Sequence, residues 1–278
     1  AYQSFAWFYA VNSGQISIRN GMKGASGVVV SDQAGGLDAV AQARRKIRGG
    51  TTVVVSGAMD ATICPWGWVA QLASGRLSTS DDPARAYLPF DLDARGYVPG
   101  EGGAILITER RQHAKDRGAS IYGEIAGYAA TFDPHPATGR EPALRKAIEL
   151  ALADADVSPA DVDVVFADAA GVPELDRAEA AAITSVFGPR GVPVTAPKTM
   201  TGRLYSGGAP LDLATAFLAM AEGLIPPTIN VRPFADHQLD LVVGSARPAQ
   251  LCTALVLARG HGGFNSVMVI RADCPTRD

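Results

Sequence analysis

The sequence predicts an α/β fold, because short apolar runs alternate along the chain with stretches that repeat at helical spacing. A strand–turn–helix–strand unit lies within residues 28–55, and a longer series of helices and strands follows after residue 120. The chain has 278 residues, of which 47% are hydrophobic and 19% are charged. A chain of this size and composition can bury a large core, as one large domain or as two tightly joined halves.

The first unit is built around a glycine-rich turn. Val28-Val29-Val30 is a β-branched run that predicts a short strand, and residues 34–48 have the apolar spacing of a helix that stops at Gly49-Gly50. Residues 52–55 predict the next strand, and residues 104–107 predict another.

The second half of the chain continues this alternation. Its predicted helices cover residues 141–155, 178–187 and 211–223, and its predicted strands cover residues 162–167, 192–194, 255–258 and 266–270. A break near Gly118 to Tyr122 separates the two series. The sequence therefore predicts an N-terminal half over residues 1–119 and a C-terminal half over residues 120–278.

Composition argues against several classes of protein. The formal net charge is −3 and no long basic run occurs, which argues against nucleic-acid binding. No apolar run approaches the ~18 residues that span a membrane, so no membrane association is expected. The three cysteines, Cys64, Cys252 and Cys274, are scattered without metal-ligand spacing, so no metal site is predicted. An odd cysteine count without a signal peptide favours a reducing, cytoplasmic setting.

The start of the chain is unusual. It begins at Ala1 rather than at a methionine, and residues 5–11 already have the composition of a core. A natural N-terminus is usually polar and frayed. We therefore expect an upstream segment that this chain lacks.

The turn of the first unit carries Gln33, in the run Ser31-Asp32-Gln33-Ala34-Gly35-Gly36. A residue on a sharp strand-to-helix turn projects toward the positive end of the helix dipole, which favours an anion such as a thiolate. A neutral glutamine amide cannot form an acyl intermediate, although it donates and accepts hydrogen bonds. Taken alone, the segment favours an ordinary strand–helix turn with a polar tip.

Four segments, in the right order and over nearly the whole chain, together resemble the β-ketoacyl synthase family. They are Val30–Gly36, which matches the family's cysteine segment with Gln33 at the cysteine, the long segment Pro89–Ala104, the lysine motif Pro197–Gly202 and the glycine loop Gly260–Asn265. The resemblance implies a thiolase-like fold with the layers α-β-α-β-α, here without its N-terminal segment.

The resemblance also identifies the positions of the reacting side chains. Condensing members of the family use a cysteine and two histidines, supported by a lysine. In this sequence these positions hold Gln33, Asp168 and Arg203, and only Lys198 is kept. Asp168 adds negative charge where an enolate would form, and Arg203 cannot act as a general base. We therefore expect no intact catalytic set, a salt bridge between Asp168 and Arg203, and a structural ion pair at Lys198.

Within the family, this combination resembles the chain length factor, or KSβ subunit, of bacterial type II aromatic polyketide synthases, which make antibiotic-type products. The resemblance implies a heterodimer with an active ketosynthase α subunit and an acyl carrier protein that bears 4′-phosphopantetheine. The chain itself is expected to bind no cofactor. The resemblance further implies that a poly-β-ketone grows in a tunnel at the interface of the pair, and that bulky side chains of the silent subunit limit its length. Trp66 is the candidate wall residue, with ordinary core or interface burial as the alternative.

The alternative function is enzymatic. Ketosynthase-like domains with glutamine at the cysteine position can be malonyl decarboxylases that prime the chain, and Gln33 would then be the active residue. Those domains keep the two histidines, which this sequence replaces.

The basic cluster Arg44-Arg45-Lys46-Arg48 has two interpretations. We interpret it as a solvated helix face rather than as a docking site for an acidic carrier protein.

Overall fold

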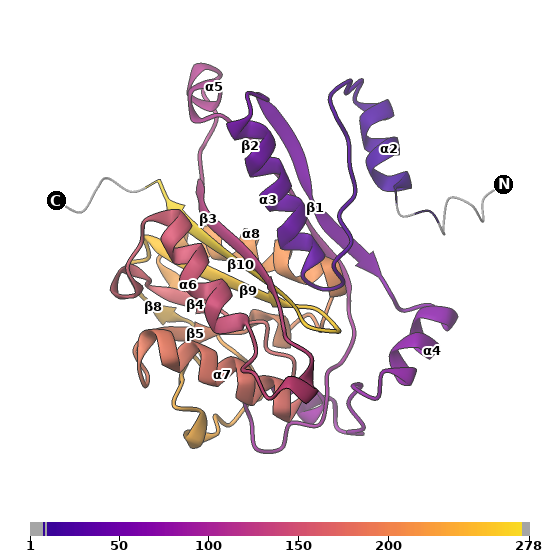
Figure 1. Ribbon diagram of the computed structural model, residues 1–278, viewed down its shortest axis with the longest axis vertical. Helices are drawn as coiled ribbons and strands as arrows, with labels where there is room; N and C mark the ends of the chain where they lie inside the picture. The colour runs from indigo at the N-terminus through magenta and orange to yellow at the C-terminus, as the bar shows by residue number, and fades with distance from the viewer. Residues whose placement is uncertain (1–7, 9, 274–278) are drawn as a thin grey trace.

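The computed structural model describes residues 8 and 10–273 and shows helices on both faces of a six-stranded sheet (Figure 1). The strand order is β3 (Gly123–Phe132), β10 (Phe264–Ala272), β9 (Thr253–Arg259), β4 (Val164–Phe166), β5 (Pro193–Thr195) and β7 (Asp240–Leu241). Strand β10 runs antiparallel to β3 and β9, whereas β9, β4, β5 and β7 run parallel to one another.

Two further sheets of two strands each complete the described strands. Strand β1 (Val53–Ala61) pairs antiparallel with β2 (Glu101–Glu109), and β6 (Leu224–Ile225) pairs antiparallel with β8 (Arg247–Pro248).

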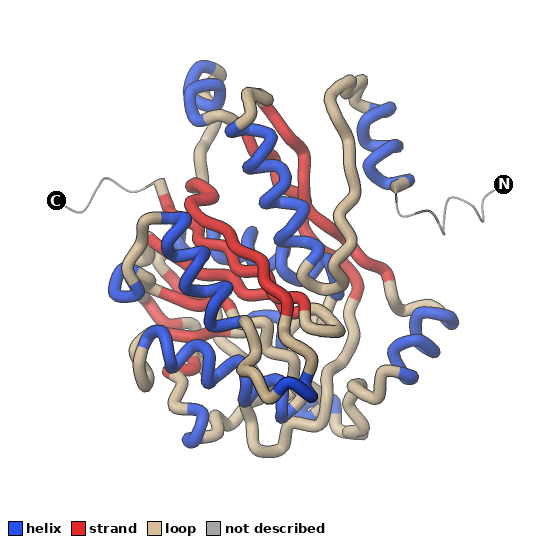
Figure 2. The backbone as a smooth tube through the Cα atoms, in the orientation of Figure 1, coloured by secondary structure: helices blue, strands red, loops and turns tan. Residues whose placement is uncertain are grey.

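The helices arrange these sheets in layers (Figure 2). Helices α3 (Gly35–Arg48) and α8 (Gly208–Glu222) lie between the β1–β2 sheet and the six-stranded sheet. Helices α6 (Leu144–Ala155) and α7 (Pro173–Phe187) cover the outer face of the six-stranded sheet. The order is therefore helices, sheet, helices, sheet, which is four of the five layers that the resemblance predicts.

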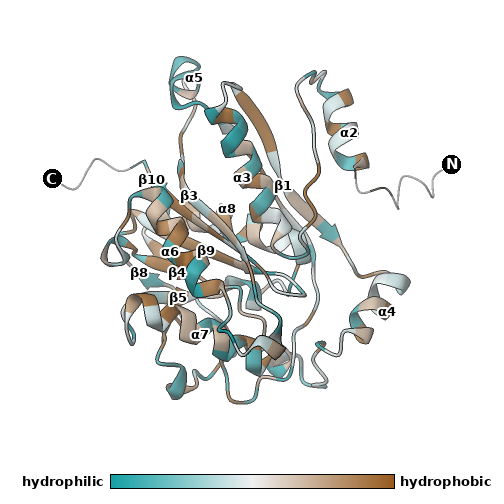
Figure 3. Ribbon diagram, in the orientation of Figure 1, coloured by the Kyte–Doolittle hydropathy of each residue, from teal (hydrophilic) through white to brown (hydrophobic). Residues whose placement is uncertain are grey.

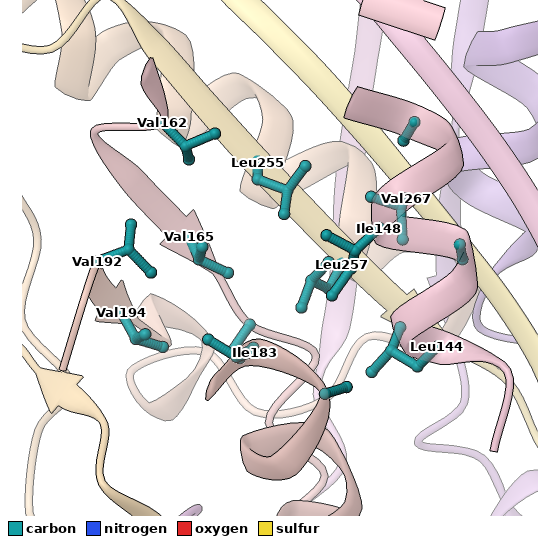
Figure 4. Packing of buried hydrophobic residues seen from close by; sticks show 14 of the residues in the cluster. Leu144, Ile148, Val162, Val165, Ile183, Val192, Val194, Leu255, Leu257 and Val267 are labelled. Atoms are coloured by element: carbon teal, nitrogen blue, oxygen red, sulfur yellow. The ribbon is translucent and has the colours of Figure 1, made fainter. Parts of the chain in front are cut away.

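One hydrophobic core fills the space between the outer helices and the sheet. Leu144 and Ile148 of α6 and Ile183 of α7 pack with Leu255 and Leu257 of β9 (Figure 4). Strands β9 and β10 are buried on both faces, so their residues form hydrophobic runs rather than an alternating pattern (Figure 3). Each of these two strands has a neighbouring strand on both sides in the sheet.

A second core includes the contact between α3 and α8, which approach each other at a glycine. A Cβ atom at Gly36 would lie 2.1 Å from the carbonyl oxygen of Ser206 and 2.4 Å from the ring of Pro210. Only glycine permits this approach. Leu37 and Leu213 are fully buried beside it. The packing fixes the N-terminal end of α3, where the turn with Gln33 lies.

Most predicted elements are present with shifted ends. The helices predicted over residues 34–48, 141–155 and 211–223 correspond to α3, α6 and α8. Helix α7 begins at Pro173 rather than at residue 178, because proline is tolerated in the first turn of a helix.

The sequence did not predict the helices α2 (Val11–Arg19), α4 (Pro65–Ala73) and α5 (Arg111–Asp116), the strand β3, or the two-residue strands β6, β7 and β8. Strand β3 contains glycines and alanines, which have low strand propensity. At Gly127 a Cβ atom would lie 2.3 Å from the carbonyl oxygen of Ala151, so the glycine allows α6 to pack closely on the strand. Packing of this kind leaves no strand signal in the sequence.

The strand predicted at Val28–Val30 is wrong. No strand covers these residues, whose side chains are 42%, 38% and 73% exposed. Among the described strands none lies beside this segment, and β-branched residues form a strand only where a neighbour accepts their backbone hydrogen bonds.

The solvated face predicted for the basic cluster of α3 is wrong for Arg44. Its side chain is 11% exposed, forms an ion pair with Asp154 at 2.6 Å and donates to the backbone oxygen of Ile125 at 3.0 Å. Arg45 and Arg48 are exposed, as predicted. Arg44 therefore joins α3 to the end of α6.

Two sequence features fall mainly or wholly outside the described residues, namely the core-like stretch over residues 5–11 and Cys274. Across residues 8 and 10–273, no helix combines the length and the apolar character needed to cross a membrane. Within the same residues, no cluster of histidine, cysteine and acidic side chains is suited to a metal ion.

Candidate functional site

The turn that carries Gln33 precedes the N-terminus of α3. Asp32 has a φ of 52°, in the left-handed region that aspartate tolerates better than most residues. Its carboxylate accepts a hydrogen bond from the backbone N–H of His261, in the glycine loop between β9 and β10. A Cβ atom at Gly260 would lie 2.9 Å from the backbone oxygen of Ser31, so the glycine loop packs directly on the turn.

A polar cluster behind the turn holds it to the sheet. Asp38 of α3 accepts hydrogen bonds from the hydroxyls of Ser31 and Ser266, and from the hydroxyl of Tyr128 at 2.6 Å. Tyr128 belongs to β3 and Ser266 to β10. The position of Gln33 is thus set by strands far from it in the sequence.

Arg203 lies at the centre of the site and joins Asp168 to Gln33. Its Nη2 lies 3.1 Å from both carboxylate oxygens of Asp168 and donates to Oε1 of Gln33, while Nη1 donates to the backbone oxygen of Asp168 at 2.7 Å. The side chains of Asp168 and Arg203 are each 6% exposed. The predicted salt bridge between them is confirmed, and Gln33 is a third member of it.

Electrostatics keep this pair ionised. Burial opposes the charge on Asp168, but Arg203 and Lys198 hold the pKa of its carboxyl below the usual range. Burial likewise opposes the charge on Arg203, whereas Asp168 raises the pKa of the guanidinium above its usual value. The guanidinium carbon also lies 5.5 Å from the centroid of the Tyr97 ring, which adds a cation–π contact.

Lys198 is held on the other side of Asp168. Its Nζ lies 2.7 Å from a carboxylate oxygen of Asp212 in α8 and donates to the backbone oxygens of Ala167 at 2.7 Å and Asp168 at 3.2 Å. The structural ion pair predicted for Lys198 is therefore confirmed. Burial raises the pKa of Asp212, and Lys198 acts in the opposite direction.

The cavity left between these side chains is about 20 Å³. It is lined by Gln33, Asp168, Lys198, Gly202, Arg203, Leu204, Tyr205, Gly208, Ala209 and Ala258. A cavity needs about 10–15 Å³ to hold one water molecule, so this one has room for a single water and not for a thioester. The four predicted positions thus meet in one site, and their side chains fill it.

Sequence analysis missed two side chains of the site, Asp176 and Glu179. Both lie on α7, are buried, and accept hydrogen bonds from the loop that carries Asp168. The available signal was their spacing, because acidic residues three apart on a helix share one face.

Trp66 lies on α4 and is not among the residues that line the cavity. Its side chain is 57% exposed, and Trp68, Val69 and Leu72 of the same helix are 41%, 65% and 56% exposed. Of the two alternatives for Trp66, core burial is therefore wrong for this chain, and burial at an interface stays a prediction. Only Gly67 and Gln71 of α4 are buried.

The turn with Gln33, the lysine pair and the glycine loop together define a ketosynthase-like protein whose nucleophile and histidines are replaced. The chain belongs to the β-ketoacyl synthase family: the family's N-terminal domain matches residues 2–114 and its C-terminal domain matches residues 122–232.

The most informative relatives are β subunits of polyketide synthases. The chain is 61% identical to the actinorhodin polyketide β-ketoacyl synthase 2 of Streptomyces coelicolor, covering 99% of this chain and 68% of the relative. It is 60% identical to the tetracenomycin polyketide synthase ketoacyl synthase β subunit of Streptomyces glaucescens, covering 98% and 67%. Identity to the polyketide β-ketoacyl synthase 1 of Streptomyces virginiae is 37%. The predicted resemblance to the KSβ subgroup is confirmed.

Solved structures agree on the fold. One neighbour is the type II ketosynthase of the AntDE:AntF complex with its acyl carrier protein, at a TM-score of 0.91 and 32% identity, covering 96% of this chain and 68% of that one. Another is the ishigamide ketosynthase/chain length factor, at a TM-score of 0.86 and 29% identity, covering 94% and 64%. The predicted thiolase-like fold is confirmed, and the chain spans about two thirds of the length of these relatives.

Proposed function

We propose that the chain is the non-catalytic, ketosynthase-like subunit of a type II aromatic polyketide synthase, which pairs with an active ketosynthase and sets the length of the polyketide. The observation that carries the proposal is the ion pair of Arg203 with Asp168, which also binds Gln33 in a cavity of about 20 Å³. A site filled in this way leaves the chemistry to the partner.

Condensation requires a nucleophile that becomes acylated and a neutral base or donor beside it. The amide of Gln33 is not a nucleophile at neutral pH, and Arg203 does not release a proton. The negative charge of Asp168 opposes the development of an enolate in the same place.

Decarboxylation through Gln33, the alternative function, is not favoured. The reaction needs room for a malonyl thioester and free donors for the enolate oxygen. The guanidinium of Arg203 is neutralised by Asp168 and its Nη2 is occupied by Gln33, while the cavity holds about one water. The close relatives of this chain are β subunits, which supports the same conclusion.

The proposed partner is an active ketosynthase, and α4 supports this part of the proposal. The helix carries no charged residue and exposes Trp66, Trp68, Val69 and Leu72. An exposed apolar surface of this kind is typical of a protein–protein interface. In the proposed complex, an acyl carrier protein delivers extender units on its 4′-phosphopantetheine arm, and this chain binds no cofactor of its own.

Trp66 is the proposed wall residue of the tunnel for the growing poly-β-ketone. A large rigid side chain that projects from a surface helix can close a tunnel formed against a partner. The proposal also includes two structural halves, residues 1–119 and 120–278, and a cytoplasmic location, which suits the free thiols of Cys64 and Cys252.

The experiment that tests the proposal is reconstitution with a fixed ketosynthase α subunit and acyl carrier protein. Product should form when this subunit is present and should be lost when it is omitted. When the subunit is replaced by a relative that makes a chain of another length, the product length should follow the β subunit. A product length that follows the α subunit instead would contradict the proposal.

A further inference from the structure

The charged side chains around the site do not balance. The buried carboxylates are Asp168, Asp176, Glu179 and Asp212, which are 0–4% exposed. The cations beside them are Lys198, Arg203 and Arg259, whose side chains are 8%, 6% and 10% exposed. Among the described residues, carboxylates thus outnumber cations in a region that excludes water.

The cations are already engaged with other groups. Arg203 pairs with Asp168, and Lys198 pairs with Asp212. The guanidinium of Arg259 donates to the backbone oxygen of Leu175 at 2.9 Å and lies 3.8 Å from another carboxylate, Asp133.

In the described part of the chain, Asp176 and Glu179 instead bind four backbone N–H groups. Glu179 accepts from Asp168 at 2.6 Å and from Ala169 at 2.8 Å, and Asp176 accepts from Gly171 and Phe90, each at 3.0 Å. Three of these donors belong to the loop 168–171 that carries Asp168.

Three of the four donor residues have left-handed backbone conformations. The φ angles are 51° at Ala169, 70° at Gly171 and 63° at Phe90. Such angles are unfavourable for alanine and phenylalanine and persist only where surrounding contacts hold them. The two carboxyl groups of α7 are among those contacts, together with the hydroxyl of Tyr87, which donates to the backbone oxygen of Ala169.

Two full negative charges one turn apart, for which the described residues provide no paired cation, are costly in a buried environment. We propose that Asp176 and Glu179 retain one proton between them at neutral pH and, in this form, position the 168–171 loop and the Asp168–Arg203 pair that fills the site. They are positioning residues, because they act through the loop.

The electrostatic surroundings agree with this. Burial raises the pKa of Asp176 to about 8, and burial together with the charge of Asp168 raises the pKa of Glu179 to about 7. Besides each other, Asp176 and Glu179 face charged groups from three other segments: Asp168 on the loop, Arg203, and Arg259 on β9. Two further titratable side chains lie nearby: Tyr87 donates to the backbone oxygen of Ala169, and His237 packs on Phe90. Burial lowers the pKa of His237, so its ring adds no positive charge at neutral pH.

Infrared spectroscopy of the folded protein with its partner present tests this inference. At neutral pH the spectrum should contain the C=O band of a buried, protonated carboxylic acid, and raising the pH through about 8 should remove it. Asp176→Asn and Glu179→Gln should each weaken or shift the band, and the matched control Asp81→Asn, at an exposed aspartate, should leave it unchanged.

Absence of a protonated carboxyl band from the folded protein at neutral pH would overturn the inference, as would a band that Asp176→Asn and Glu179→Gln both leave unchanged. If either variant does not fold, the pH titration of the unmodified protein decides the question. The result does not depend on polyketide synthesis, so it stands or falls separately from the proposed function.

Discussion

The site around Gln33 and the helix α4 differ in both the burial and the charge of their side chains. At the site, charged side chains are buried, paired with each other and packed until about 20 Å³ remains. On α4, two tryptophans and two aliphatic side chains stand 41–65% exposed on a helix without charges. In a condensing enzyme the inner site would need to be open to substrate. Here the inner site is closed, and the side chains available to bind another molecule are the exposed apolar ones of α4.

The difference indicates what each region does. The closed site stabilises the fold, so its variants should change stability. Helix α4 contributes little to the core, so its variants should change the complex and its products. The following predictions separate these two outcomes, in order of decreasing effect.

The largest effect is expected from breaking the buried ion pair. Asp168→Ala or Arg203→Ala leaves one uncompensated buried charge and should lower the free energy of unfolding by about 3–5 kcal/mol. The double variant should cost no more than either single variant, because it removes both charges. Urea unfolding of the three variants measures this, and additive losses would show that the two side chains act independently.

The second effect is a pH dependence of stability that comes from Asp176. Its folded pKa of about 8 lies above the ordinary 3.8, so its stabilising contribution is complete below pH ~4 and is lost as the pH rises through 8. Relative to Asp81→Asn, Asp176→Asn should flatten the decline of the unfolding free energy with rising pH across this window. Unfolding free energies at several pH values provide the comparison, and parallel profiles for the two variants would refute the assignment.

The third effect concerns products. Trp66→Ala should lengthen or broaden the range of polyketides if the indole closes the tunnel, while unfolding should change by less than about 1 kcal/mol because the side chain is 57% exposed. Tyr122→Ala is the matched control, because it removes an aromatic side chain that is 60% exposed and lies outside α4. Mass spectrometry of the products decides, and an unchanged profile from a well-folded heterodimer would remove Trp66 from the wall.

The smallest effect is expected from restoring the nucleophile. Gln33→Cys alone should yield no condensing activity, because Arg203 and Asp168 still fill the site and no histidine is present. Acyl transfer to residue 33, followed by intact-mass measurement with the partner's cysteine blocked, is the readout. An acylated subunit would show that the site opens in the complex.

The sequence was informative where local pattern and structure coincide. Helices α3, α6 and α8 follow from apolar spacing, and Gln33, Asp168, Lys198 and Arg203 follow from motifs that fix their positions. The pairing of Asp168 with Arg203 could be predicted because a buried charge needs an opposite charge.

The rest depends on contacts between distant segments. Val28–Val30 has strand composition but no neighbouring strand, and β3 has a neighbour but weak strand composition. The roles of Asp176 and Glu179 depend on which face of α7 meets the 168–171 loop, which the spacing alone does not specify. The exposure of Trp66 could likewise not be predicted from the sequence, because tryptophan is usually buried.

Release of CO2 from malonyl-acyl carrier protein tests the central claim most directly. The assay uses this subunit paired with an α subunit whose cysteine is blocked, and compares it with the same pair carrying Gln33→Ala. The account predicts equal release in both pairs, at the level of the blocked α subunit alone. Release that exceeds this level and disappears in Gln33→Ala would show that the subunit is a decarboxylase and would contradict the silent site.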